Sequence, residues 1–150
     1  MAEIYHPRYT TRLIGHAAAE QTLLKHSNGN AIPHAWLITG PRGVGKATLA
    51  YRFARYLLTH DTAAPQDGLF GDALSATLPA TLESDPEHPA LRRIEEGSHT
   101  DMLVLEPDAE EGKTEITVDA VRKVAHLLGH TASESSWRII IVDSADELNR

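Results

Sequence analysis

The chain has 150 residues, 41% hydrophobic and 23% charged, which is typical of one soluble domain and too short for two. The formal net charge of −7 and the scattered basic residues argue against a broad basic face for nucleic acid, and no apolar run approaches the ~20 residues of a membrane span. The absence of cysteine excludes disulfides, thiol catalysis and cysteine-ligated zinc, and with an N-terminus that lacks signal-peptide features it leads us to expect a cytoplasmic protein.

An extended arm, a helix and a short strand are predicted before residue 40. Residues 1–12 show no periodicity and are expected to be extended. A helix is predicted over about His16–His26, and its apolar side is formed by Ala17, Ala18, Leu23 and Leu24. Pro33 precedes Ala35–Thr39, whose apolar residues predict a short buried strand.

Gly40–Thr48, with the sequence GPRGVGKAT, is a glycine-rich loop between that strand and a helix predicted over Ala47–Leu58. Its glycines let the backbone turn so that consecutive N–H groups and the helix N-terminus face inward, where an anion is favoured. Lys46 is then placed to reach the β- and γ-phosphates of a nucleotide. The pattern predicts a phosphate-binding loop, and the alternative is a glycine-rich turn that binds no ligand.

The residue after the lysine limits the chemistry of this loop. In Walker A motifs that residue is Ser or Thr, whose hydroxyl coordinates Mg²⁺. Here it is Ala47, and Thr48 lies about 100° further around the helix, so its hydroxyl points elsewhere. We therefore predict weak binding of ATP or ADP with little use of Mg²⁺.

The middle of the chain, residues 60–100, is dense in Pro, Asp, Glu, Gly and Ala. It predicts a long insertion with short helices near Gly71–Leu82 and Pro89–Glu95. The nine histidines of the chain are scattered and suggest no convincing metal-ligand set in it, so we expect no zinc.

A strand and a further helix are predicted after the insertion. Met102–Leu105 has strand character, and Thr117 is the expected N-cap of a helix that ends at Gly129. The apolar residues near one face of this helix are Val118, Val121, Val124, Ala125 and Leu128.

Residues 137–143 form a continuous, largely β-branched run that ends in an aspartate. The run predicts a central parallel strand covered on both faces by helices, and the alternation of strands and helices predicts an α/β fold with a doubly wound parallel sheet flanked by helices. Four apolar residues before Asp143 have the form of a Walker B motif, in which the aspartate holds Mg²⁺ or its water shell. The alternative is a buried strand whose last residue caps the next helix.

Ser144 stands where ATPases of the motor class have a glutamate that orients the attacking water. Positioning and electrostatics supply nearly all of phosphoryl-transfer catalysis. The lack of both this glutamate and a hydroxyl at position 47 therefore predicts little or no ATP hydrolysis, with Asp146 or Glu147 as the only acidic substitutes nearby. We assign no catalytic residue and no metal ligand.

Three segments carry a resemblance to a known family. They are Ile32–Ala50, Ile116–Asp119 followed by Arg122, and Ile141–Asn149. In these segments the chain resembles the N-terminal AAA+ domain of bacterial clamp-loader subunits, in particular the delta-prime subunits of DNA polymerase III. The resemblance covers most of the chain and weakens in residues 60–100.

This resemblance implies a role in DNA replication. In the family, delta-prime is a rigid, non-hydrolysing member of a pentamer that opens the sliding clamp and places it on primed DNA. The implied partners are the delta and gamma/tau subunits and, through the complex, the sliding clamp and primer–template DNA, with no membrane partner. The resemblance also implies that Ile14 and Gly15 lie near the adenine of a bound nucleotide.

Two departures from the family are visible. Many members carry a four-cysteine zinc module after the phosphate-loop helix, and residues 60–100 take its place without cysteine. The sequence also stops at Arg150, just after the Walker B-like strand. By resemblance we expect residues 1–150 to be the N-terminal part of an AAA+ domain, truncated before its remaining strands, with the lid and collar absent.

Two other classes stay open alongside a delta-prime subunit. A hydrolysing clamp-loader ATPase of the gamma/tau type would need Ser or Thr at position 47 and Glu at position 144. A P-loop kinase or GTPase would need an acceptor-binding or guanine-binding segment, which we do not find. The expected nucleotide-binding residues are Ile14, Gly15, Gly40, Pro41, Arg42, Gly43, Val44, Gly45, Lys46, Ala47, Thr48 and Asp143.

Overall fold

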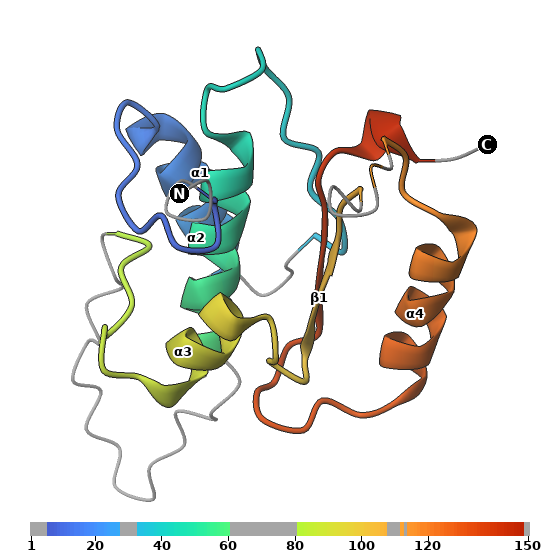
Figure 1. The fold of residues 1–150 in the computed structure, drawn as a ribbon. Coiled ribbons are helices and arrows are strands. Elements are labelled where there is room, and N and C mark those ends of the chain that lie inside the picture. Colours follow the sequence, from blue (N-terminus) through green and yellow to red (C-terminus); the bar gives the residue numbers. More distant parts are fainter. Residues whose placement is uncertain (1–5, 28–32, 61–80, 108–111, 113, 149–150) are drawn as a thin grey trace, which may run out of the picture. The chain divides into compact units, whose positions relative to one another are not determined.

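The computed structural model describes residues 6–27, 33–60, 81–107, 112 and 114–148, and it divides into two units, residues 1–88 and 89–150. Unit 1 carries the helices α1 (Ala17–Ser27) and α2 (Lys46–Thr59), which contact each other (Figure 1). Both helices begin and end within a residue or so of their predicted bounds. The helix predicted near Gly71–Leu82 lies almost entirely outside the described residues.

The helix α1 buries Leu23 and Leu24, as predicted, but Ala17 and Ala18 in its first turn are exposed. The helix α2 supplies most of the buried side chains of unit 1, which are Leu49, Tyr51, Phe53, Ala54, Arg55, Tyr56, Leu57 and Leu58. Trp36 contacts both helices through edge-on ring contacts, 5.4 Å from His26 and 5.9 Å from Phe53 between ring centroids. These aromatic contacts fix the segment before the glycine-rich loop against the helix pair.

The strand predicted at Ala35–Thr39 is wrong: this segment has no strand assignment, and the side chain of Leu37 is 83% exposed. A strand is held by ladder hydrogen bonds to a neighbour, and no described residue of unit 1 forms such a ladder with this segment. Apolar composition alone therefore did not make it a buried strand.

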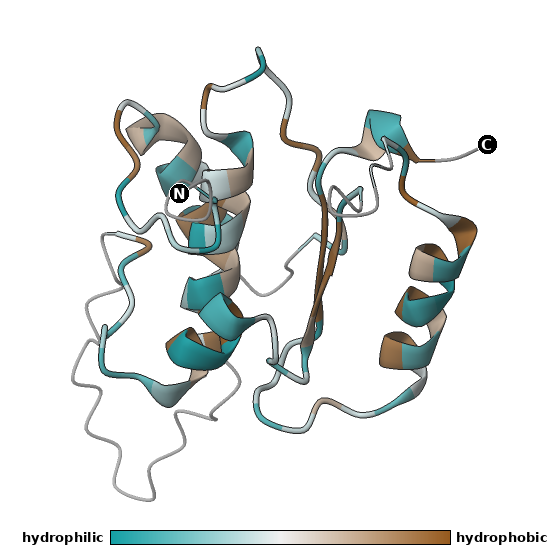
Figure 2. Ribbon diagram, in the orientation of Figure 1, coloured by the Kyte–Doolittle hydropathy of each residue, from teal (hydrophilic) through white to brown (hydrophobic). Residues whose placement is uncertain are grey.

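Unit 2 contains α3 (Pro89–Glu96), β1 (Met102–Leu105), α4 (Val118–Gly129), β2 (Ile139–Val142) and a short 3₁₀ helix. The strands pair in parallel from Met102 opposite Ile139 to Leu105 opposite Val142, and α4 contacts β1 (Figure 1). Figure 2 shows that hydrophobic residues dominate both strands. The unit is thus a small α/β arrangement, as predicted at the level of class.

The predicted strand at 137–143 is shorter than expected, and among the described residues β2 pairs with β1 alone. Ile141 is buried, whereas Val142 is 38% exposed. The prediction of a central strand covered on both faces therefore does not hold within the described part of unit 2. There β2 has a neighbouring strand on one edge only, and just one of its four residues is buried.

The helix α4 begins and ends as predicted, with the Thr117 side chain accepting a hydrogen bond from the Ala120 N–H at 3.3 Å. Its apolar face is only partly covered: Val118, Val121 and Leu128 are 51%, 40% and 49% exposed. Across all described residues, the structure shows no helix with both the length and the apolar character needed to cross a membrane.

The N-cap of α4 gives a first prediction. Thr117→Ala removes the side-chain acceptor for one otherwise unpaired N–H, so the free energy of unfolding should fall by about 1 kcal/mol in urea titrations. Thr114→Ala, an exposed change outside the helix, is the matched control and should have no measurable effect. Equal losses in both variants would contradict a capping role.

Candidate functional site

The glycine-rich loop leads directly into α2 and has the backbone conformation that its glycines were predicted to allow. Gly43 and Gly45 have φ angles of +81° and +101°, in the region that residues with a Cβ rarely adopt. Gly45 is the N-cap of α2 and offers no side-chain acceptor, and the first turn of the helix contains no acidic residue. The positive end of the helix dipole is therefore not neutralised by the helix's own side chains.

The Lys46 side chain folds back over the loop. Its Nζ donates hydrogen bonds to the backbone carbonyls of Gly40 and Pro41, each at 2.9 Å. These are neutral acceptors, and the structure gives Lys46 no ion pair with an Asp or Glu among the described residues. The Lys46 ammonium thus places a positive charge next to the loop backbone, which suits an anionic ligand.

The two neighbours of Lys46 on its C-terminal side are half-buried. Ala47 has no hydroxyl, and Thr48 occupies the third position of α2. A Mg²⁺ ligand directly after the lysine is therefore missing from this loop.

Residues 13–16 lie against the loop. The imidazole Nε2 of His16 is 2.7 Å from the carbonyl oxygen of Val44, and a Cβ added to Gly45 would come within 2.8 Å of Leu13 Cδ1. Ile14, by contrast, is 76% exposed, and Gly15 has a φ of +84°. Ile14 and Gly15 are thus flanked by two residues that contact the loop, Leu13 and His16, and contact of Ile14 and Gly15 with adenine remains a prediction.

Two arginines of α2 hold the segment that precedes residue 13, and sequence reasoning did not identify them. Arg55, which is 4% exposed, donates to the carbonyls of Arg8 and Thr10, and Arg52 donates to the carbonyl of Thr11. Arg52 also forms an ion pair with Glu20 of α1 at 2.9 Å. Their spacing of three residues on one helix was the available signal.

Asp143 follows β2 directly, and its backbone N–H donates to the carbonyl of Leu105 at 2.9 Å. Ser144 and Glu147 form a capping box around the 3₁₀ helix Ala145–Glu147, in which a Glu147 carboxylate oxygen lies 3.5 Å from the Ser144 N–H. The Glu147 carboxylate thus faces the backbone of its own turn, and its use as a substitute for a water-orienting glutamate stays a prediction. Asp143 belongs to unit 2 and the loop to unit 1, so their joint use in one site stays a prediction.

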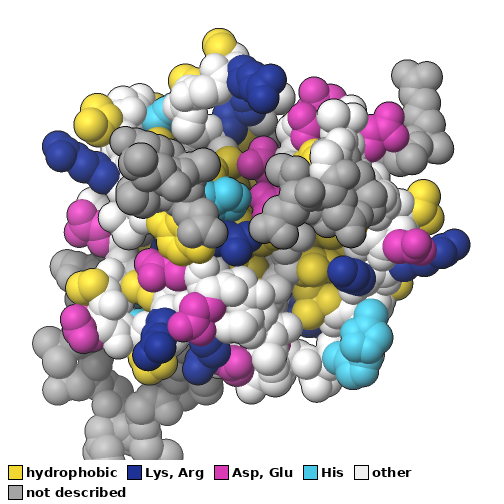
Figure 3. Space-filling view, viewed as in Figure 1, with side chains coloured by type: hydrophobic (Ala, Val, Ile, Leu, Met, Phe, Trp, Pro, Cys, Tyr) yellow, Lys and Arg dark blue, Asp and Glu magenta, His cyan; other side chains and the backbone are white. Residues whose placement is uncertain are grey.

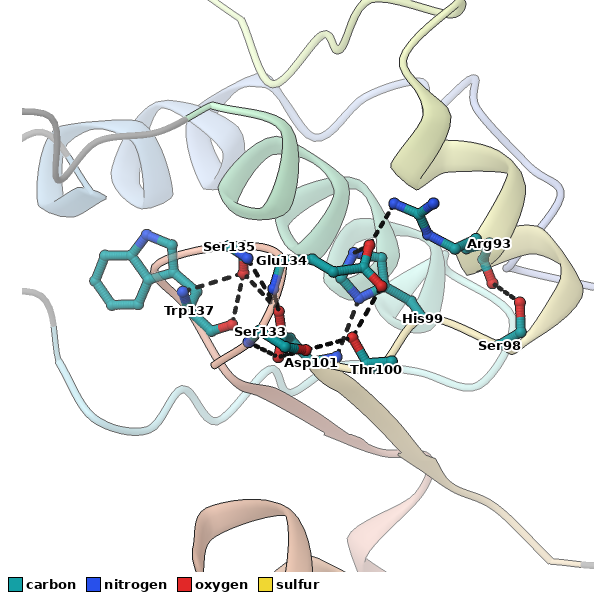
Figure 4. Close-up of polar contacts among 9 residues, drawn as sticks. All are labelled: Arg93, Ser98, His99, Thr100, Asp101, Ser133, Glu134, Ser135 and Trp137. Atoms are coloured by element: carbon teal, nitrogen blue, oxygen red, sulfur yellow. Dashed lines mark hydrogen bonds and ion pairs between the residues drawn. The ribbon is translucent and has the colours of Figure 1, made fainter. Parts of the chain in front are cut away.

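A buried carboxylate that the sequence did not single out organises the start of both strands (Figure 4). Asp101 is 2% exposed and accepts hydrogen bonds from the backbone N–H groups of Ser133, Glu134 and Ser135 at 2.8, 2.7 and 3.0 Å. The Asp101 carbonyl accepts from the N–H of Ile139, the first residue of β2, at 2.9 Å. One residue therefore fixes both the turn at 133–135 and the start of the parallel ladder.

Charged side chains surround this turn. Glu134 forms an ion pair with Arg93 of α3, accepts a hydrogen bond from Thr100 at 2.9 Å, and lies 4.0 Å from Nε2 of the buried His99. Burial on its own would raise the pKa of Asp101, but the three backbone N–H groups and the Ser133 hydroxyl lower this pKa below its ordinary value of 3.8. The arrangement is that of a structural clamp, because every group donates to or neutralises another group of the same cluster.

No group of three or more potential metal ligands occurs among the residues that the structure describes. His126 and His130, four residues apart, have ring centroids 4.5 Å apart, and the Nδ1 atom of His130 lies 2.7 Å from the carbonyl of His126. As predicted, the helix ends between them, at Gly129.

On the face shown in Figure 3, basic side chains lie among acidic and polar ones.

The clamp gives a second prediction. Asp101→Asn should lower the free energy of unfolding by about 1–3 kcal/mol near neutral pH, because buried N–H donors lose a charged acceptor. Since the folded-state pKa is lowered, the wild type should lose this contribution as the pH falls from about 4 through that pKa, and the two proteins should converge in acid-unfolding curves.

The exposed Asp119→Asn is the matched control, since Asp119 pairs with Arg122 at the surface and such pairs contribute little. A constant stability difference between wild type and Asp101→Asn down to acid pH would contradict the assigned role of the carboxylate.

Comparison with known proteins gives a consistent result. The chain matches the family described as DNA polymerase III, delta subunit, over residues 15–150. It is 31% identical over 131 residues to the DNA polymerase III subunit delta' of Pseudomonas aeruginosa, a match that covers 87% of this chain and 34% of the relative.

Two further relatives are DNA polymerase III gamma subunits. Those of Buchnera aphidicola from Acyrthosiphon pisum and from Schizaphis graminum are 22% and 21% identical over 150 residues, which is all of this chain and 36% and 35% of the relatives. The chain therefore spans about a third of the length of the curated relatives it matches. No solved structure was found to match it.

Proposed function

The chain belongs to the delta-prime clamp-loader family of DNA polymerase III, and on that premise we propose that it is the N-terminal part of a delta-prime subunit that holds nucleotide weakly and does not hydrolyse it. Its role is to help load the sliding clamp during DNA replication. The proposed partners are the delta and gamma/tau subunits and, through the complex, the clamp and primer–template DNA, in the cytoplasm.

The observation that carries the proposal is the combination of a formed loop with an incomplete set of catalytic groups. The Lys46 ammonium lies over the glycine-rich loop, and no acidic side chain of the first turn of α2 neutralises the positive end of the helix dipole. Both features support the binding of phosphate groups. Ala47 gives no hydroxyl for Mg²⁺, Ser144 gives no carboxylate for water, and Glu147 is engaged in the capping box. Such a loop supports binding better than turnover.

A second candidate is an active replication ATPase of the gamma/tau type. The observation in its favour is the similarity to two gamma subunits over the whole chain, although at lower identity than the delta' relative. The residues at positions 47 and 144 speak against it. A steady-state ATPase rate of the full-length protein separates the two, and brisk Mg²⁺-dependent turnover would establish the second candidate in place of the first.

Nucleotide titrations give a third prediction. The wild type should bind ATP weakly with little dependence on Mg²⁺, whereas Ala47→Thr should bind more tightly when Mg²⁺ is present, because the new hydroxyl can coordinate the ion. Lys46→Ala should weaken binding by roughly 10- to 100-fold through the loss of a charge-assisted hydrogen bond.

Thr22→Ala is the control, because it removes an exposed hydroxyl of α1 that donates to the carbonyl of Ala18, and it should leave binding unchanged. Equal and strong Mg²⁺ dependence in the wild type and in Ala47→Thr would overturn the proposed role of position 47. Unchanged affinity in Lys46→Ala would exclude the loop as the phosphate site.

A further inference from the structure

One contact on the phosphate loop is not used by the Walker A pattern. The Nε2 atom of His16 lies 2.7 Å from the carbonyl oxygen of Val44, 28 residues away in the sequence. A carbonyl can only accept, so Nε2 carries the hydrogen and donates it. The contact joins the residue before α1 to the residue before the N-cap of α2.

The contact matters because of the peptide unit that it holds. In a trans peptide the carbonyl and the following N–H lie in one plane and point in opposite directions. With the Val44 carbonyl directed at His16, the Gly45 N–H is directed away from His16. Glycine tolerates either sign of φ, so Gly45 does not by itself fix the orientation of this peptide, and the hydrogen bond from His16 to the Val44 carbonyl favours the observed one.

The backbone of His16 is itself held in place. The backbone carbonyl of His16 accepts from the N–H of Glu20 at 3.0 Å as α1 begins, and Leu13 lies so close to Gly45 that a Cβ there would come within 2.8 Å of it. Upstream, Arg52 and Arg55 of α2 hold the carbonyls of the preceding segment. Contacts within unit 1 thus connect α2 to the segment before residue 13, and they connect His16, which follows that segment, to the glycine-rich loop that leads into α2.

We propose that His16 is a positioning residue of the phosphate site, which fixes the Val44–Gly45 peptide so that the Gly45 N–H is presented to a diphosphate or triphosphate group. The inference rests on the proposed nucleotide binding and deepens it. His16 acts through the backbone and does not itself contact the ligand. Its loss should therefore lower the affinity for any ligand that carries the phosphates, whether or not the ligand has a base.

The test compares His16→Leu, which removes the donor, with His16→Gln, whose amide NH₂ can donate to the same carbonyl. Affinities of the full chain for ADP and for pyrophosphate are measured by calorimetry. We expect His16→Leu to weaken both ligands by about tenfold, the equivalent of one hydrogen bond, and His16→Gln to stay within about threefold of the wild type. His34→Leu, at an exposed histidine with no hydrogen bond to the loop among the described residues, is the control and should bind as the wild type does.

A second readout needs no ligand. The ¹³C resonance of the Val44 carbonyl should move in His16→Leu, return toward its wild-type position in His16→Gln, and stay unchanged in His34→Leu. If the wild type binds both ligands and His16→Leu binds them equally well, the positioning role is overturned while the proposed function stands. If the wild type binds neither ligand, the proposed function fails, and the carbonyl resonance alone decides whether His16 orders the loop.

Discussion

The hydrogen bonds from Arg55 to the carbonyls of Arg8 and Thr10 are the constraint on which the geometry of unit 1 depends. A guanidinium that is only 4% exposed needs acceptors, because an unpaired buried charge is costly. Backbone carbonyls accept from its Nη1 and Nη2 atoms here and order a segment that lacks secondary structure of its own. Leu13 and His16, which contact the glycine-rich loop, follow directly after the segment that is held in this way.

Unit 2 uses the opposite chemistry for a similar purpose. There a buried carboxylate, Asp101, accepts hydrogen bonds from backbone N–H groups, and the nearby cation, Arg93, pairs with Glu134. Both units thus fix irregular backbone by charged side chains that reach across more than thirty residues of sequence. Such contacts avoid the cost of leaving peptide groups unpaired where no helix or strand can satisfy them.

Local patterns in the sequence predicted the local structure well. The glycines at 43 and 45, the Thr117 cap and the strand at 102–105 all follow from residues within a few positions of one another. The failures involve partners far away in the chain: within the described residues, Ala35–Thr39 has apolar residues but no ladder, and β2 has one neighbouring strand where two were expected. Arg55 and Asp101 were missed for the same reason, since nothing in their immediate surroundings indicates which backbone groups they contact.

The two carbonyl contacts of Lys46 have a thermodynamic meaning for ligand binding. A lysine side chain has about 2 kcal/mol of rotamer entropy to lose when it is immobilised. Here the ammonium is already localised over Gly40 and Pro41, so most of that loss accompanies folding and would not accompany the proposed binding of phosphate. An anion that binds there would replace the two neutral carbonyl oxygens as the acceptors of the Lys46 hydrogen bonds. In this sense the loop is preorganised for an anion.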